Sequence, residues 1–159
     1  CFFSQDRTKP QEGLCDPQKN EIRSFGCISF SIFRRLSIMS DKKVRALLVI
    51  PHKHIEETFI GTSLEELQQA VDGLIELVPD RHGCHILCNE EGKIRGFEPN
   101  RVYGSDVLVG TFLIVRIDDE GEFVSVTDDD ISTYRKTFDE PMSEEETSYW
   151  RSALSWFTR

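Results

Sequence analysis

Apolar and polar positions along the chain fall into short runs that are typical of β-strands. Runs that are continuously apolar, or that alternate apolar with polar residues, predict strands at 44–50, 55–60, 74–78, 84–88, 107–117 and 123–126. The run at 107–117 is the most apolar and does not alternate. We therefore expect it at the centre of a sheet, covered on both faces and bent near Gly110. Residues 94–106 show no regular pattern and predict an irregular connection.

Three further segments show the helical spacing of apolar residues. Each begins with a serine or threonine that is followed three positions later by an acidic residue, a pairing that caps helix N-termini. The pairs are Ser63 with Glu66, Thr127 with Asp130, and Ser143 with Glu146. Gly73 predicts the end of the first helix, and Pro141 predicts the end of the second.

This order of elements predicts an α+β fold. We expect a small mixed or mostly antiparallel sheet that opens as hairpin, helix and hairpin. The first helix should pack on one face of the sheet, with the two C-terminal helices beside it. The predicted domain covers residues 39–140.

The last predicted helix, within residues 141–159, has a broad apolar face. Its members are Tyr149, Trp150, Ala153, Trp156 and Phe157. We expect this amphipathic helix to pack on the domain. The alternative is a surface for a protein partner, formed by Trp150, Trp156 and Phe157.

The first 38 residues differ from the rest, because they mix residue types without a period and precede the first methionine, Met39. One hypothesis is that they are an untranslated leader. Arg34 and Arg35 can be encoded by AGG-AGG, a bacterial ribosome-binding sequence, at a suitable distance from an ATG at Met39. The alternative is a genuine disordered tail or a short strand at 27–33.

Charge and composition narrow the possible functions. The chain is 38% apolar and 30% charged, which is typical of a soluble globular protein. Residues 118–147 contain twelve acidic residues against two basic ones, a field that repels phosphate backbones, so direct nucleic-acid binding is disfavoured. The longest apolar run is about half of the ~20 residues that a membrane-spanning helix needs, so no membrane span is expected. Cys84 and Cys88 should be free thiols in a reducing cytoplasm.

The candidate ligand-binding residues lie in the predicted connections. Asn100 and Arg101 could clamp an anionic ligand, because arginine offers a two-pronged donor and asparagine offers both a donor and an acceptor. Asn89 and Lys93, in a polar turn, are weaker candidates. The alternative is that Asn100 and Arg101 tie down their loop by hydrogen bonds.

No metal, cofactor or catalytic residue is expected. His82, Cys84, His85 and Cys88 are close in sequence, but strand alternation sends His85 to the opposite face from both cysteines. His52 and His54 lack an identifiable third ligand. The chain has no nucleophile elbow, phosphate-binding loop, zinc-protease motif or dinucleotide fingerprint, which favours a protein that is not an enzyme.

Several motifs occur in a characteristic order. They are Ser63-Leu-x-x-Leu-Gln68, Gly73-x-Ile-Glu-x-Val78, Ile86-x-Cys-Asn-Glu-Glu-Gly-Lys93, Pro99-Asn-Arg101 and Gly110-Thr-Phe-x-Ile-Val115. Over about residues 44–138 this order resembles the family called domain of unknown function 3846. The resemblance implies a small bacterial domain that is common in phages and mobile elements. Asp72 departs from the pattern, because the family often has a second glycine there, and so does the chain after Pro141.

Three functions are compatible with these observations. The favoured one is an acidic accessory protein of a phage or mobile element that binds an unknown protein partner without catalysis. The second is a module that holds an anionic metabolite or nucleotide near Asn100 and Arg101. The third is an acidic mimic of nucleic acid that inhibits a DNA-binding enzyme, suggested by the charge of residues 118–147.

Overall fold

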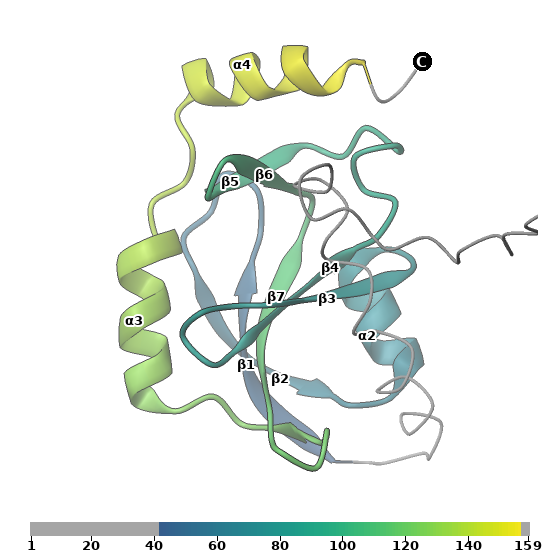
Figure 1. Cartoon of the computed structure of the whole chain (residues 1–159), viewed down its shortest axis with the longest axis vertical. Helices are drawn as coiled ribbons and strands as arrows, with labels where there is room; N and C mark the ends of the chain where they lie inside the picture. Colours follow the sequence, from purple (N-terminus) through teal and green to yellow (C-terminus); the bar gives the residue numbers. More distant parts are fainter. Residues whose placement is uncertain (1–41, 157–159) are drawn as a thin grey trace, which may run out of the picture.

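The structure, a computed structural model, describes residues 42–156 (Figure 1). In chain order these residues form β1 (Lys43–Val49), β2 (Glu56–Gly61), α2 (Leu64–Val71), β3 (Ile75–Pro79), β4 (His85–Asn89), β5 (Pro99–Tyr103), β6 (Asp106–Val109), β7 (Phe112–Ile117), β8 (Phe123–Val124), α3 (Asp128–Phe138) and α4 (Glu144–Leu154). The predicted α+β class is confirmed. The hypotheses about residues 1–38 and about Phe157 concern residues outside the described range.

The larger sheet has β7 at its centre. Its strand order is β2-β1-β7-β4-β3, with β8 paired to β7, and every pairing described between strands is antiparallel. Residues 112–115 are all buried, because helices cover both faces of this strand. The prediction of a central strand without alternation is therefore confirmed for the β7 part of residues 107–117.

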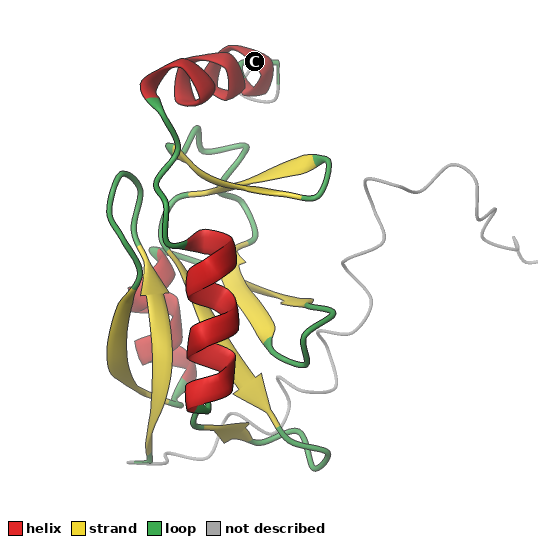
Figure 2. Ribbon diagram, turned by 90° about the vertical axis from the view of Figure 1, so that its left-hand side faces the viewer, coloured by secondary structure: helices red, strands yellow, loops and turns green. Residues whose placement is uncertain are grey.

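Alternating side chains of the central strands form two apolar clusters, one on each face. Ala46, Leu87, Leu113 and Val115 lie on the face that α2 covers, whereas Leu47, Ile86, Phe112 and Ile114 lie on the face that α3 covers. Figure 2 shows α3 lying along its face of the sheet, with α2 behind. The three helices of residues 42–156 therefore lie in three different places, since α4 lies over the end of the molecule that carries the smaller sheet (Figures 1 and 2).

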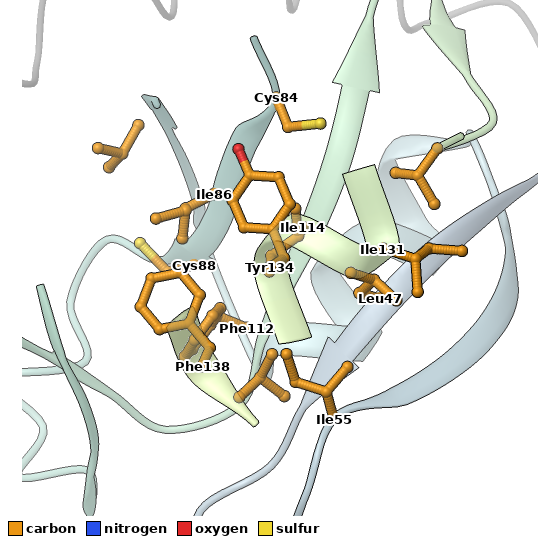
Figure 3. Packing of buried hydrophobic residues seen from close by; sticks show 13 residues of the cluster. Leu47, Ile55, Cys84, Ile86, Cys88, Phe112, Ile114, Ile131, Tyr134 and Phe138 are labelled. Carbon is orange, nitrogen blue, oxygen red and sulfur yellow. The ribbon is translucent and has the colours of Figure 1, made fainter. Parts of the chain in front are cut away.

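The cluster under α3 is rich in aromatic rings. Tyr134 and Phe138 stack nearly parallel, at 6.3 Å between ring centroids, and Phe138 meets Phe112 edge to face at 5.9 Å. Figure 3 shows the Tyr134 ring near Ile86, with its hydroxyl on the side of Cys84. These contacts fix α3 against β4 and β7.

A hairpin of β5 and β6 begins at Pro99, within the stretch 94–106 that was predicted to be irregular, and only residues 94–98 of that stretch are irregular as predicted. The prediction of one bent strand over residues 107–117 was also wrong, because β6 belongs to this two-stranded sheet and β7 to the larger one. The chain changes direction at Gly110, whose φ of 66° is a conformation that glycine adopts without a steric cost. Gly110 was thus correctly identified as the bend, but it separates two sheets.

Helix α4 packs on this hairpin through a narrow stripe. Leu154 is buried and Trp150 is partly buried against Val107 and Val109 of β6. An ion pair between Arg151 and Glu98 adds a polar contact at the edge. One face of α4 is therefore used to cover the outer side of β6.

The C-terminus of α2 carries a strained residue at the position where the sequence departs from the family pattern. Asp72 ends the helix with φ 58° and ψ 48°, the left-handed conformation that glycine usually supplies after a helix. Its side chain makes only a long, exposed ion pair with Arg95, at 3.5 Å. The structure thus explains why a glycine suits this position.

We expect Asp72→Gly to raise the free energy of unfolding by about 0.5–1 kcal/mol, because it removes the left-handed strain and loses little with the exposed ion pair. Urea denaturation followed by circular dichroism measures the change. Asp72→Ala is the matched control: it keeps the strain, removes the same carboxylate and should not stabilise the protein. Stabilisation by alanine and not by glycine would contradict the explanation.

Candidate functional site

Arg101 is a buried structural arginine, 3% exposed, whose five N–H groups all donate within the fold. Its Nε donates to the carbonyl of Phe138 at 2.7 Å, and Nη1 donates to the main-chain and side-chain oxygens of Asn100 at 2.9 and 2.8 Å. Nη2 donates to the carbonyls of Lys53, at 2.5 Å, and Asp139, at 3.5 Å. One side chain thus joins β5, the β1–β2 turn and the C-terminus of α3.

Asn100 is equally enclosed, at 1% exposure. Its Nδ2 donates to the carbonyls of Val49, at 3.0 Å, and Gly110, at 2.6 Å. Its Oδ1 accepts from Arg101. The residue therefore fixes the end of β1 to the point where the chain leaves β6 for β7.

These contacts favour the second interpretation of Asn100 and Arg101, in which they hold their segment by hydrogen bonds. An anion clamp needs donors that face solvent, but the donors of both side chains are engaged by carbonyl and amide oxygens of the protein. The two residues also lie in a strand, where the sequence predicted a loop. Together, Asn100 and Arg101 hold β5 to the end of β1, to the β1–β2 turn and to the C-terminus of α3.

The two weaker candidates also serve the fold. Asn89 is buried, and its Nδ2 donates to the carbonyls of Val71 and Asp72, which closes the C-terminus of α2. Lys93 pairs with Asp106 at the start of β6. Asn89 and Lys93 thus contact different parts of the fold from each other and from Asn100 and Arg101. The four predicted ligand residues do not form one site.

A polar cluster that the sequence did not indicate lies at the β3–β4 turn. Both tyrosine hydroxyls of the cluster, from Tyr103 and Tyr134, donate to the carboxylate of Asp80 at 2.7 Å. Burial and the bond to Asp80 raise the pKa of Tyr103 to about 12, and the same causes raise that of Tyr134 further. Both tyrosines are therefore neutral donors. The only sequence signal was a turn residue, Asp80, beside His82 and Gly83.

The thiols of Cys84 and Cys88 are buried in surroundings that make them unreactive. Burial, with the charge of Asp130, raises the pKa of Cys84 to about 11, and burial, with the charge of Glu76, raises that of Cys88 to about 12. Both are free cysteines with 7% exposure or less. A neutral, enclosed thiol is a poor nucleophile.

We expect neither Cys84 nor Cys88 of the native full chain to be alkylated by iodoacetamide at pH 7.5. Both should be alkylated once the chain is unfolded in urea. Peptide mapping by mass spectrometry reads each cysteine separately, so the other cysteines of the chain do not interfere. Native labelling of either residue at its rate in urea would contradict the burial described.

No three histidine, cysteine or acidic side chains among residues 42–156 are grouped so that they could hold a metal ion. The alternation predicted for β4 holds, because Cys84 and Cys88 belong to the cluster under α3 while His85 is not part of it. The structure also has no helix in its described part that is long and apolar enough to cross a membrane.

Asp130 carries the main buried carboxylate of the α3 N-terminus. It completes a capping box with Thr127 and accepts two bonds from Nη1 of Arg116, at 2.9 and 2.8 Å. Burial by itself raises the pKa of this carboxyl, but the bonds from Thr127 and Arg116 outweigh it and hold the pKa below its ordinary 3.8. The carboxylate form thus stabilises the folded state.

Folding stability should therefore depend on pH through Asp130. A carboxyl whose pKa is lowered by folding contributes its full stability above the unfolded value, and loses it as pH falls through the folded value. We expect the difference in unfolding free energy between the wild type and Asp130→Asn to shrink below about pH 4. Urea denaturation at pH 7, 4 and 3 measures it, with the exposed Asp129→Asn as control. A difference that is constant with pH would contradict the role of this charge.

The outer face of α4 carries apolar side chains that the hairpin does not cover. Tyr149 is 67% exposed and Trp156, just past the helix, is 77% exposed, with exposed Ala153 between them. Trp150, by contrast, is packed inward, so the predicted partner surface of Trp150 and Trp156 is divided between two faces. We call Tyr149, Ala153 and Trp156 the outer stripe.

The comparisons with known proteins concern the part of the chain before α4. The model of one protein family, described as a domain of unknown function (DUF3846), matches residues 44–139 and confirms the resemblance based on the ordered motifs. No curated protein and no solved structure matches the chain.

Proposed function

As the chain belongs to the domain of unknown function 3846 family, whose description carries no activity, we propose a function from its own surface. The protein acts without catalysis, by binding a partner protein through the outer stripe of α4. In this proposal it is a cytoplasmic accessory protein of a bacterial phage or mobile element, in keeping with the family that its motifs resemble.

The exposure of the outer stripe is the observation that carries the proposal. Positions 149 and 153 lie on one side of α4 at helical spacing, and Trp156 follows two residues after the helix ends at Leu154. The helix buries Leu154 and partly buries Trp150 against the hairpin, so these two residues attach α4 to the domain. Exposed tyrosine and tryptophan side chains are the residue types that dominate protein–protein interfaces.

The charge around the stripe suggests the chemistry of the partner. Glu144 and Glu145 are exposed in the first turn of α4, and the whole chain has a formal net charge of −9. Complementary charge steers encounter and selects partners. The expected partner surface is therefore an apolar groove with basic residues at its rim.

Two features support an action without catalysis in a reducing compartment. Two buried polar side chains, Arg101 and Asn100, are engaged in the fold, and the two thiols are neutral and enclosed. Free cysteines that form no disulfide are typical of cytoplasmic proteins.

The proposal is tested by affinity capture of the full chain expressed in its native host. We expect a partner to be recovered with the wild type and lost with the double variant Tyr149→Ala, Trp156→Ala. Phe59→Ala is the matched control, because Phe59 is another aromatic residue, 70% exposed, on β2. Reconstitution with the purified partner then gives the affinities, and the double variant should bind about tenfold or more weakly.

Two results would contradict the proposal. One is a partner that binds the double variant as tightly as the wild type. The other is a partner that is lost with Asp118→Asn, Asp119→Asn in the exposed β7–β8 turn and kept by the α4 double variant. That second result would instead favour an acidic surface that mimics nucleic acid.

A further inference from the structure

A small hollow lies between the β3–β4 turn, the β5–β6 hairpin and α3, on a different part of the molecule from the outer stripe. Its volume is about 200 Å³. Its lining residues include His82, Tyr103, Asp80, Tyr134 and Phe138, of which Tyr134 and Phe138 are buried, at 0% and 2% exposure. His82 is exposed and Tyr103 half-buried, so the hollow opens to solvent beside these two rings.

The carboxylate of Asp80 is held in place by neutral donors alone. Oδ1 accepts from Tyr103, and Oδ2 accepts from Tyr134 and from the backbone N–H of His82, at 3.1 Å. The backbone N–H of Arg81 is a fourth neutral donor to this carboxylate. The geometry fixes the group without neutralising it.

The charge of Asp80 has no counter-ion in the described structure. Within residues 42–156, no lysine, arginine or histidine nitrogen lies within ion-pair distance of this carboxylate. Burial acts to raise the pKa of the group, but the two tyrosine hydroxyls and the backbone N–H groups of His82 and Arg81 hold it below its ordinary value, so it is ionised at neutral pH. A partly buried carboxylate without a cation is costly, and a cation that enters the hollow would relieve that cost.

We propose that this hollow is a binding site for a single alkyl-ammonium or guanidinium group, which donates to the Asp80 carboxylate and lies against the rings of His82 and Tyr103. Aromatic faces attract cations, and an ionised carboxylate without an ion-pair partner provides the charge. This ligand is positively charged, whereas the ligand expected at Asn100 and Arg101 was an anion.

The size of the hollow limits the ligand to the end of one side chain or to a small free amine. Pockets for drug-sized molecules have volumes of about 300–1,000 Å³, so a nucleotide or a larger metabolite would not fit. The cationic group can come from a lysine or arginine of a protein or from a free amine. Arg81, which is exposed and also lines the hollow, places a like charge beside the ligand and should weaken its binding.

The test is an NMR titration of the ¹⁵N-labelled full chain with two probes at constant ionic strength. Agmatine represents a free amine, and the capped peptide acetyl-Gly-Arg-Gly-amide represents a protein side chain. We expect saturable shifts of the amide signals of His82, Gly83 and Gly104. Tighter binding of agmatine would identify a free amine as the ligand, whereas equal or tighter binding of the peptide would identify a side chain.

Asp80→Asn removes the charge and keeps an acceptor for a tyrosine hydroxyl, and it should weaken binding of the probes about tenfold or more. The matched control is Asp119→Asn, which removes the same charge from an exposed turn and should leave the affinity unchanged. Arg81→Gln should tighten binding, and it decides the question if Asp80→Asn does not fold. The proposal is overturned if neither probe gives saturable shifts. It is also overturned if Asp80→Asn binds like the wild type, or if Arg81→Gln fails to bind more tightly.

Discussion

Replacement of Arg101 by methionine is expected to lower the free energy of unfolding by about 3–5 kcal/mol. Methionine retains much of the side-chain volume but donates no hydrogen bond. The carbonyls of Phe138, Lys53 and Asn100 would then lose their donor inside the protein. Each buried acceptor left unpaired costs about 1–3 kcal/mol, so the combined loss is large even if the site relaxes.

Urea denaturation followed by circular dichroism measures this loss. Arg135→Met is the control, because Arg135 makes an exposed ion pair with Glu57 at 3.1 Å, and such pairs contribute about 0–1 kcal/mol. If Arg101→Met lowers the free energy of unfolding no more than Arg135→Met does, the hydrogen bonds of Arg101 do not stabilise the fold.

Replacement of Phe138 by alanine is the second change with a large expected effect, a loss of about 3–5 kcal/mol. The ring is 2% exposed and contacts the rings of Tyr103, Phe112 and Tyr134. Its removal leaves a cavity at the end of α3, at the position whose carbonyl accepts from Arg101. Since α3 is held to the sheet by this cluster, the helix should lose much of its attachment.

The same denaturation experiment tests this expectation with two comparisons. Phe138→Leu fills part of the cavity and should lose clearly less than Phe138→Ala. Phe59→Ala removes an exposed ring and should change the free energy of unfolding by less than about 0.5 kcal/mol. Equal effects of Phe138→Ala and Phe59→Ala would contradict the packing described for α3.

The elements whose signals are local could be predicted from the sequence. The capping residues Ser63, Thr127 and Ser143 each accept from the backbone three positions later, as their spacing predicts. The lack of alternation in residues 112–115 likewise indicated a strand covered on both faces. These patterns depend on neighbours in the chain, which the sequence shows directly.

The hairpin of β5 and β6 could not be predicted in the same way. Asn100 and Arg101 are polar residues at buried positions of a strand, so they erase the apolar pattern that would have marked it. Their partners, Val49 and Phe138, lie 51 and 37 positions away. The Asp80 cluster was missed for the same reason, because Tyr134 reaches it across 54 positions.

In the last helix, one amphipathic pattern contains two sets of apolar side chains with different surroundings. Its aromatic residues were interpreted as one face, but Trp150 packs on the hairpin while Tyr149 and Trp156 point outward. Helical spacing alone separates positions 150 and 154 from positions 149, 153 and 156, yet it does not tell which set is covered. That distinction depends on where the β5–β6 hairpin lies.

The central claim is that a partner binds the outer face of α4, whereas the buried polar residues only stabilise the fold. Amide hydrogen exchange of the full chain, measured with and without the reconstituted partner, tests this claim most directly. We predict that the partner slows exchange of amides in residues 144–156 and leaves β5, with Asn100 and Arg101, unchanged. Slower exchange at β2 or in the β7–β8 turn, with none in α4, would contradict this result.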